Sequence, residues 1–425
     1  MLKLESNLTI FEDFESEVRS YCRSFPAMFS NGLNSHIFDV EGNRYFDFFS
    51  GAGALNYGHN NPQLKKKLLE YIEQDGIAHS LDMATEAKAK FLEKFKETIL
   101  KPRGMEFKIQ FTGPTGTNAV ESSLKLARKV TKREKVLFFT QAFHGMTLGS
   151  LSISGNAFKR DGAGLPLTNT VCMPYCGYME DMDTIGYIDR LLKCSGSGID
   201  LPAAVIVETV QAEGGVNVAS IEWLEKLQVL CKKYEMLFIV DDIQAGCGRT
   251  GTFFSFDNMN LSPDIVCLSK SISGYGLPMA ICLIRPELDI WEPGEHNGTF
   301  RGNNLAFITA TEALKFWENS DFSKEIIRKG QIIKNHLNGL EDSFPDQISE
   351  IRGKGFIFGI AFKEEGNGSL LSKTCFENYL LAETSGADSD VVKLLPPLTI
   401  GDEDLKKGLN IIEESMSILH GKALH

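Results

Sequence analysis

A lysine in the middle of the chain is placed where its amine could do covalent chemistry. Lys270 comes shortly after the segment 264–268, which has the apolar pattern of a buried strand. Open α/β proteins bind ligands at the carboxyl ends of their strands. We therefore expect this amine to face a site, where it is a candidate to form a Schiff base. A solvated lysine that caps the strand is the alternative, because lysines are usually exposed.

Two adjacent acids follow a second strand-like segment, 237–240. Consecutive strand residues face opposite sides, so only one of Asp241 and Asp242 can enter a given site, and we assign Asp241 to it. A buried carboxylate needs a cationic partner, since burying it unpaired is costly. The protonated pyridine nitrogen of pyridoxal phosphate (PLP) would be such a partner, and its protonation makes the ring an electron sink. An acid pair that caps the next loop is the alternative.

A phosphate-bearing cofactor also needs an anion site, and the segment 111–121 is rich in glycine and threonine. Its small residues would let backbone N–H groups approach a phosphate, with Gly116 and Thr117 at the positive end of the helix that follows. Taken alone, the segment is also typical of a plain helix cap, and it is neither a P-loop nor a dinucleotide-binding fingerprint. Phe143, just beyond the strand-like segment 136–139, could stack on a planar ring or belong to the core.

In this order, these residues resemble the class III (ω-amino-acid type) PLP aminotransferases of fold type I, and the resemblance covers nearly the whole chain. The set that carries it is Gly116-Thr117, Phe143-His144-Gly145, Glu208, Gln211 to Gly215, Asp241, Gln244, Lys270 and Thr299. Segments 241–256, 274–280 and 294–307 are most similar to members that transfer the 4-amino group of L-2,4-diaminobutyrate to 2-oxoglutarate in ectoine biosynthesis. The resemblance implies this reaction here, with L-aspartate 4-semialdehyde and L-glutamate as products.

The resemblance also implies a role for each matching residue. Lys270 would be the catalytic residue that bonds to the cofactor aldehyde, and Asp241 would pair with the pyridine nitrogen. Gly116 and Thr117 would bind the phosphate, together with Thr299 from the neighbouring subunit of a dimer. Phe143 would stack on the ring, Gln244 would lie near the 3′-oxygen, and Glu208 would lie beneath the cofactor. The site would thus be shared across the interface of a homodimer. His144 also matches a family position, but we assign it no chemical step.

Three residues are candidates for binding the amino-acid and 2-oxo-acid substrates. Glu213 matches a family glutamate that can gate the substrate site. Many members carry an arginine where this chain has Lys393, and that arginine clamps the 2-oxoglutarate carboxylate through two parallel hydrogen bonds. Lysine is a point charge and cannot reproduce this fork. Either Lys393 binds the carboxylate less rigidly, or Arg301 takes over the clamp; a structural ion pair is the alternative for Arg301.

The pattern of the chain must bring these strand ends together. Helical and strand-like segments alternate, which is typical of a parallel sheet covered on both faces. Strands are predicted at 109–111, 136–139, 203–207, 237–240, 265–268 and 280–284, and helices at 9–21, 62–74, 85–100, 305–316 and from 402. Together with the resemblance, this predicts an α/β fold whose large PLP-binding domain, 61–320, contains a mainly parallel seven-stranded sheet. A smaller α/β domain would combine 1–60 with 321–425.

Composition sets outer limits on the function. The 425 residues are 43% hydrophobic, which suffices for a large core, and the net charge of −12 argues against a nucleic-acid partner. Nine cysteines without close pairing fit a reducing compartment, and we predict no metal site. Residues 1–7 lack the apolar core of a signal peptide, and no segment approaches about 18 consecutive apolar residues. We therefore expect a soluble, cytoplasmic protein without a membrane partner.

Other functions stay open at this point. Within the same cofactor class, the chain could be another ω-amino-acid aminotransferase, of the ornithine or 4-aminobutyrate type, or an aminomutase that needs no keto acid. A catalytically silent scaffold of the same fold is disfavoured because Lys270 and Asp241 are both present. The pathway is also open, since diaminobutyrate transamination can serve ectoine, siderophore or diamine synthesis.

Overall fold

The computed structural model describes residues 8–180 and 182–421. Its largest sheet has seven strands, which in spatial order are β4 (Lys108–Phe111), β12 (Ile281–Ile284), β11 (Ile265–Leu268), β10 (Leu237–Asp241), β7 (Ala204–Val207), β5 (Val136–Phe139) and β6 (Thr170–Met173). β10 pairs in parallel with β11 and β7, and β5 pairs in parallel with β7 and β6. Only β12 is antiparallel to its neighbours in this sheet. The predicted mainly parallel seven-stranded sheet of an α/β fold is therefore confirmed.

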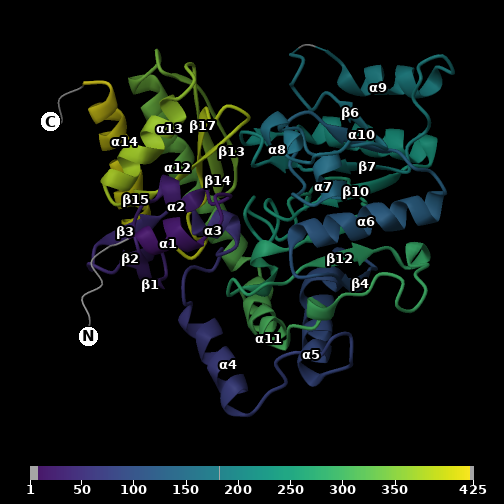
Figure 1. The fold of residues 1–425 in the computed structure, drawn as a ribbon, viewed down its shortest axis with the longest axis horizontal. Coiled ribbons are helices and arrows are strands. Elements are labelled where there is room, and N and C mark those ends of the chain that lie inside the picture. The colour runs from purple at the N-terminus through teal and green to yellow at the C-terminus, as the bar shows by residue number, and fades with distance from the viewer. Residues whose placement is uncertain (1–7, 181, 422–425) are drawn as a thin grey trace.

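Helices surround this sheet in the half of the molecule coloured blue to green in Figure 1. They are α4 (Pro62–Glu73), α5 (Glu86–Phe95), α6 (Gly116–Thr131), α7 (Leu148–Ser152), α8 (Ala157–Asp161), α9 (Thr184–Lys193), α10 (Ile221–Tyr234) and α11 (Asn304–Ala313). α11 packs against both α4 and α5. The chain also forms a small hairpin of β8 (Val210–Gln211) and β9 (Asn217–Val218), whose connecting loop contains Glu213.

Side chains of the central strands alternate between two apolar layers. Val207 and Phe238 belong to the layer that contains residues of α9 and α10, whereas Ile206 and Ile239 belong to the layer that contains the inner face of α6. Because alternate strand residues point to opposite faces, both faces of the sheet are buried. Strands buried on both sides have continuous apolar sequences, which is why the sequence revealed them as short apolar segments.

The two ends of the described chain come together on the other side of the molecule, where the purple and yellow segments meet in Figure 1. Their strands are β1 (Phe29–Leu33), β2 (His36–Asp39), β3 (Arg44–Asp47), β13 (Ile348–Lys354), β14 (Ile357–Phe362), β15 (Leu380–Leu381), β16 (Glu383–Ser385) and β17 (Val391–Leu394). Their helices are α1 (Thr9–Phe14), α2 (Tyr21–Ser24), α3 (Ser50–Gly53), α12 (Asp321–Ser343), α13 (Asn367–Glu377) and α14 (Asp402–Leu419). β15 pairs in parallel with β3, so the two ends share one sheet. The domain boundaries near residues 60 and 320 stay a prediction.

The structure differs from the predicted elements in two places. The helix expected at 9–21 ends at Phe14, because the backbone of Glu15 is extended, and the apolar side chains of Phe14 and Val18 are 82% and 87% exposed. The apolar face that its periodicity predicts is therefore not buried in the described chain. The strand β6 at the sheet edge was not predicted, because its sequence, TVCM, is short and only partly apolar.

Two further expectations concern membranes and the amino terminus. Among the described helices, none is both long and apolar enough to cross a membrane. The expectation about a signal peptide rests on residues 1–7, which lie outside the described residues.

Candidate active site

The carboxyl ends of β5, β7 and β10 and the amino end of α6 meet at a cavity of about 170 Å³. Eight of the residues selected from the sequence line it: Gly116, Thr117, Phe143, Glu208, Glu213, Asp241, Gln244 and Lys270. Five others complete the lining: His144, Gly145, Val210, Ile243 and Ala245. The fold therefore brings together residues that lie far apart in the sequence, from Gly116 to Lys270.

Lys270 begins a short 3-10 turn, Lys270–Ser273, directly after β11 and Ser269. Its φ of +49° lies in the left-handed region, which is unfavourable for a residue with a side chain and is typical of functional sites. The Nζ donates a hydrogen bond of 2.9 Å to the backbone oxygen of Ala52. Burial lowers the pKa of this amine, although the negative charge of Glu213 opposes the shift. The Lys270 amine therefore loses its proton more readily than a solvated lysine does.

Asp241 and Asp242 turn to opposite sides of β10. Asp241 lines the cavity, and its Oδ2 lies 2.6 Å from Nδ1 of the buried His144. Burial opposes protonation of His144, but the hydrogen bond and charge of Asp241 outweigh it and raise the pKa of the imidazole. Asp242 instead accepts a hydrogen bond of 3.1 Å from the backbone N–H of Ser255, and burial raises its pKa to about 7.

The amino end of α6 is suited to bind an anion. Thr115 makes no side-chain capping hydrogen bond to the described part of this helix, so N–H groups of the first turn are left for another acceptor. Gly145, with φ of +134°, lies against the first turn, and a Cβ there would come within 2.4 Å of the Thr117 Oγ1. Small residues therefore keep the backbone accessible at the positive end of a 16-residue helix.

Phe143 and Glu208 lie side by side in the lining. The backbone N–H of Phe143 donates a 3.0 Å hydrogen bond to Oε1 of Glu208. Burial is the main cause that raises the pKa of Glu208 to about 8, so this carboxyl tends to hold a proton near neutral pH. The Nζ of Lys159 lies 4.3 Å from the centre of the Phe143 ring, a cation–π contact.

Of the three candidate substrate residues, only Glu213 lines this cavity. Lys393 is fully buried, and its Nζ donates a 2.6 Å hydrogen bond to Oε1 of Glu213. Gln244 joins the pair: its Nε2 lies 3.1 Å from the same Glu213 oxygen, and its Oε1 accepts from Lys393 at 3.3 Å. Lys393 therefore does not line the cavity itself, but it contacts Glu213 and Gln244, which do.

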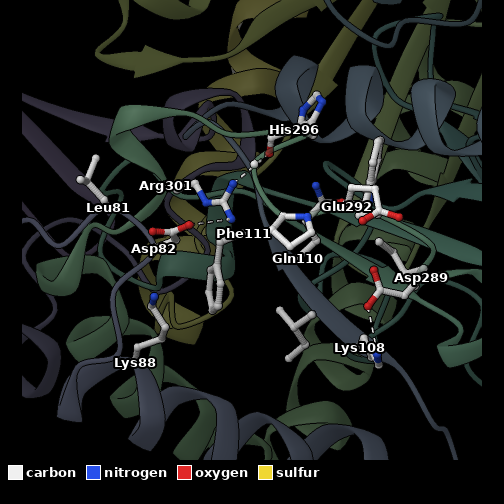
Figure 2. A pocket seen from close by; sticks show the side chains of 15 residues that line it. Leu81, Asp82, Lys88, Lys108, Gln110, Phe111, Asp289, Glu292, His296 and Arg301 are labelled. Carbon is white, nitrogen blue, oxygen red and sulfur yellow. Dashed lines mark hydrogen bonds and ion pairs between the residues drawn. The ribbon is translucent and has the colours of Figure 1, made fainter.

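Arg301 and Thr299 lie outside the cavity of their own chain. Arg301 lines a second pocket of about 420 Å³, where its Nη1 donates to the backbone oxygen of His296 at 2.9 Å and its Nη2 lies 3.8 Å from Asp82 (Figure 2). Thr299 is exposed, and its backbone oxygen accepts a 2.7 Å hydrogen bond from Nε2 of His79. The contact of Thr299 with a neighbouring subunit's phosphate site and the carboxylate clamp by Arg301 stay predictions.

Some features of the site were not found by sequence reasoning. The carbonyl of Ala52 accepts hydrogen bonds from Lys270 and, at 2.7 Å, from Nε2 of Gln244. Gly51, Ala52 and Gly53 have positive φ angles, and the two glycines were the only sign of this tight turn in the sequence. Glu383, the second partner of Lys393 at 3.1 Å, gave no signal. In the described part of the chain, no group of three or more His, Cys, Asp or Glu side chains is arranged to hold a metal ion.

Known proteins resemble the chain over nearly its whole length. A family model described as "Aminotransferase class-III" matches residues 19–416. A diaminobutyrate–2-oxoglutarate transaminase of Halalkalibacterium halodurans is 58% identical, with 98% of this chain and 97% of the relative covered. A protein of the same name from Virgibacillus pantothenticus is 56% identical, with 96% and 99% covered.

Solved structures of aminotransferases share the fold of the chain. An ornithine aminotransferase from Toxoplasma gondii has a TM-score of 0.84 and 26% identity, with 98% of this chain and 95% of that chain covered. A second structure of the ornithine aminotransferase from this organism has a TM-score of 0.85 and 26% identity, with 99% of this chain and 97% of that chain covered. It is described with partial occupancy of PLP at the active site.

Proposed function

Because the chain belongs to the class-III aminotransferases, we propose that it transfers the 4-amino group of L-2,4-diaminobutyrate to 2-oxoglutarate. The products are L-aspartate 4-semialdehyde and L-glutamate. The observation that carries this proposal is a cavity with a half-buried lysine, a buried aspartate and an uncapped helix end, in a chain 58% identical to a diaminobutyrate–2-oxoglutarate transaminase.

PLP is the cofactor of this enzyme, and the cavity fits it in three respects. The uncapped amino end of α6 offers N–H donors for a phosphate, and Asp241 offers a buried carboxylate for a protonated ring nitrogen. Lys270 offers an amine whose pKa is lowered by burial, as covalent attachment to an aldehyde requires. When bound, PLP supplies an electron sink next to the carbon that loses its proton.

We assign the cofactor contacts to residues of the cavity lining. With PLP bound, Gly116 and Thr117 would hold the phosphate, Asp241 would pair with the ring nitrogen, and Phe143 would stack on the ring. Gln244 would interact with the 3′-oxygen, and Glu208 would contact the cofactor from below. The hydrogen bond from His144 keeps the Asp241 carboxylate oriented.

Lys270 moves the proton in the reaction. With its pKa lowered by burial, the Nζ accepts a proton from the substrate carbon that bears the reacting amine, and it can return a proton later. Acid–base assistance of this kind is worth roughly 10²–10⁴-fold in rate. The Ala52 carbonyl, 2.9 Å from Nζ, keeps the amine pointed into the cavity.

Several finer assignments belong to the same proposal. The enzyme acts as a homodimer in which Thr299 completes the neighbouring phosphate site, which its exposure outside its own cavity supports. All nine cysteines are free, which supports a reducing, cytoplasmic location. Ectoine biosynthesis is the proposed pathway, on the resemblance of segments 241–256 and 294–307. The two-domain division, 61–320 and 1–60 with 321–425, is likewise proposed.

An assay of glutamate formation tests the reaction. With PLP, diaminobutyrate and 2-oxoglutarate, we expect the enzyme to form glutamate and aspartate 4-semialdehyde. Ornithine and 4-aminobutyrate serve as competing donors and should give lower kcat/KM. Product formation from diaminobutyrate that continues unchanged without 2-oxoglutarate would instead indicate an aminomutase, and a higher kcat/KM for ornithine or 4-aminobutyrate would reassign the donor.

A further inference from the structure

One buried ammonium group, that of Lys393, contacts two carboxylates beside the cavity, the half-buried Glu213 and the buried Glu383. Lys393 in β17 lies directly opposite Glu383 in β16 in the register of the antiparallel pair. Its Nζ is 2.6 Å from Oε1 of Glu213 and 3.1 Å from Oε1 of Glu383. The side chain of Lys393 is 0% exposed and that of Glu383 is 6% exposed. Glu213 lines the cavity, whereas Glu383 approaches Lys393 from outside it.

The charges of this cluster do not balance when both acids are ionised. One ammonium and two carboxylates leave a net charge of one negative unit in a buried place, which is costly. Oε1 of Glu383 has no well-aligned hydrogen-bond donor within the described chain. Glu383 is therefore the less well stabilised of the two carboxylates, and Glu213, with hydrogen bonds from both Lys393 and Gln244, is the better stabilised one.

The pKa directions agree with this geometry. Burial is the main cause that raises the pKa of Glu383 to about 7; the charge of Lys393 partly opposes this rise, and the repulsion of Glu213 adds to it. Burial also acts on Glu213, but the charges of Lys393 and Lys270 outweigh it and hold its pKa below the usual range. Tyr21 of α2 also faces the cluster, and its pKa is raised by burial and by both acids, so it stays neutral. Among Lys393, Glu213, Glu383 and Tyr21, Glu383 is thus the group that gains or loses a proton near neutral pH.

We propose that Glu383 is a specificity-determining residue that acts through Lys393: its charge weakens the attraction of this ammonium for a second substrate carboxylate, and its protonation restores it. The inference rests on the proposed function. Glutamate and 2-oxoglutarate carry a second carboxylate, whereas the far end of diaminobutyrate carries both an ammonium and a carboxylate. Glu383 therefore favours diaminobutyrate as amino donor and makes dicarboxylate binding depend on pH.

The sign of the pH dependence follows from which form binds better. A dicarboxylate binds best when Glu383 is protonated, because the cluster is then neutral. Its affinity is fully present below the pKa of Glu383 and falls as pH rises through about 7. Binding above that pH must take up a proton. The glutamine in Glu383→Gln has the shape of the protonated acid but cannot ionise. The dicarboxylate affinity of this variant should therefore be high and should not change as pH rises through about 7.

A binding experiment with the PLP-loaded enzyme tests this without catalysis. Glutarate, a dicarboxylate with no reacting amine or ketone, is titrated calorimetrically at about pH 6 and about pH 8.5, with butyrate as the monocarboxylate control. We expect the glutarate Kd of the wild type to rise about threefold to tenfold over this range, and that of Glu383→Gln to stay at the low value. Titration in buffers of different ionisation enthalpy should show more proton uptake in the wild type at the higher pH.

Two further variants separate charge from packing. Glu403→Gln, an exposed residue of α14, makes the same charge change and should behave like the wild type. Glu383→Asp keeps the charge and should keep the pH-dependent Kd. In kinetic assays, Glu383→Gln should raise the ratio of kcat/KM for glutamate to that for diaminobutyrate about threefold to tenfold, mainly through the KM for glutamate.

A pH-dependent Kd that persists in Glu383→Gln would overturn the inference, as would an equal change in Glu383→Asp and Glu383→Gln. A wild type that forms no glutamate from diaminobutyrate would refute the proposed function instead. Even then, the glutarate titration would still decide the role of Glu383 in dicarboxylate binding.

Discussion

Lys270→Ala is expected to abolish transamination while the fold remains. The variant loses both the covalent attachment to PLP and the proton-transfer group. The second loss alone lowers kcat by roughly 10²–10⁴-fold. The left-handed φ of +49° at this position is unfavourable for lysine and alanine alike, so the substitution does not change the backbone strain. Thermal unfolding of the apo protein should therefore be little affected. Turnover with diaminobutyrate and 2-oxoglutarate, measured beside circular dichroism, checks both parts.

The matched control for this variant is Lys226→Ala. Lys226 lies on α10, its side chain is 55% exposed, and it pairs with Glu222 at 2.7 Å. It should retain full turnover, because surface ion pairs of this kind contribute little. If Lys270→Ala kept more than about a tenth of the wild-type kcat, a loss smaller than the range for acid–base assistance, the assignment of the proton transfer would be wrong.

Asp241→Asn is the second change with a large expected effect. It removes the carboxylate that we place against the ring nitrogen and that lies 2.6 Å from the His144 Nδ1. Losing a preorganised charge at a reacting group typically lowers kcat by about 10²–10³-fold. The rate of the first half-reaction, followed by the absorbance change after diaminobutyrate is added to the loaded enzyme, should fall by this amount. A normal rate would show that Asp241 does not stabilise the charge that develops in the reaction.

The neighbouring acid provides the control for this experiment. Asp242→Asn makes the same chemical change one residue away, where the side chain faces the N–H of Ser255 and not the cavity, and it should retain the half-reaction rate. Because burial raises the pKa of Asp242 to about 7, the native protein binds this proton more tightly than the unfolded chain does. The stability from this group is therefore lost as pH rises through about 7. Above that pH, Asp242→Asn should unfold at a higher temperature than the wild type.

The parts of the site that depend on one segment at a time could be predicted from the sequence. Asp241 ends one short apolar strand and Lys270 comes shortly after another, and strand ends of an α/β sheet gather at one edge. The same pattern gave the α6 end, because Gly116 and Thr117 come immediately before an apolar helix face. The division of Asp241 and Asp242 between two sides follows from the two-residue period of a strand.

The parts that depend on long-range pairing could not be predicted. No local pattern relates Ala52 to Lys270, although their hydrogen bond fixes the amine. Glu383 follows a short apolar stretch at the start of β16, and only its register with β17 brings it to Lys393. The helix expected at 9–21 ended early because periodicity describes one face of a segment and cannot supply the core that would cover it.

The central claim is that the amine of Lys270 carries the cofactor. The most direct test is to load the purified enzyme with PLP, reduce it with borohydride, digest it and map the modified peptide by mass spectrometry. We expect one pyridoxyl group per chain, on the peptide that contains Lys270. A reduced, loaded enzyme whose pyridoxyl group is found on another lysine, or on none, would contradict the account.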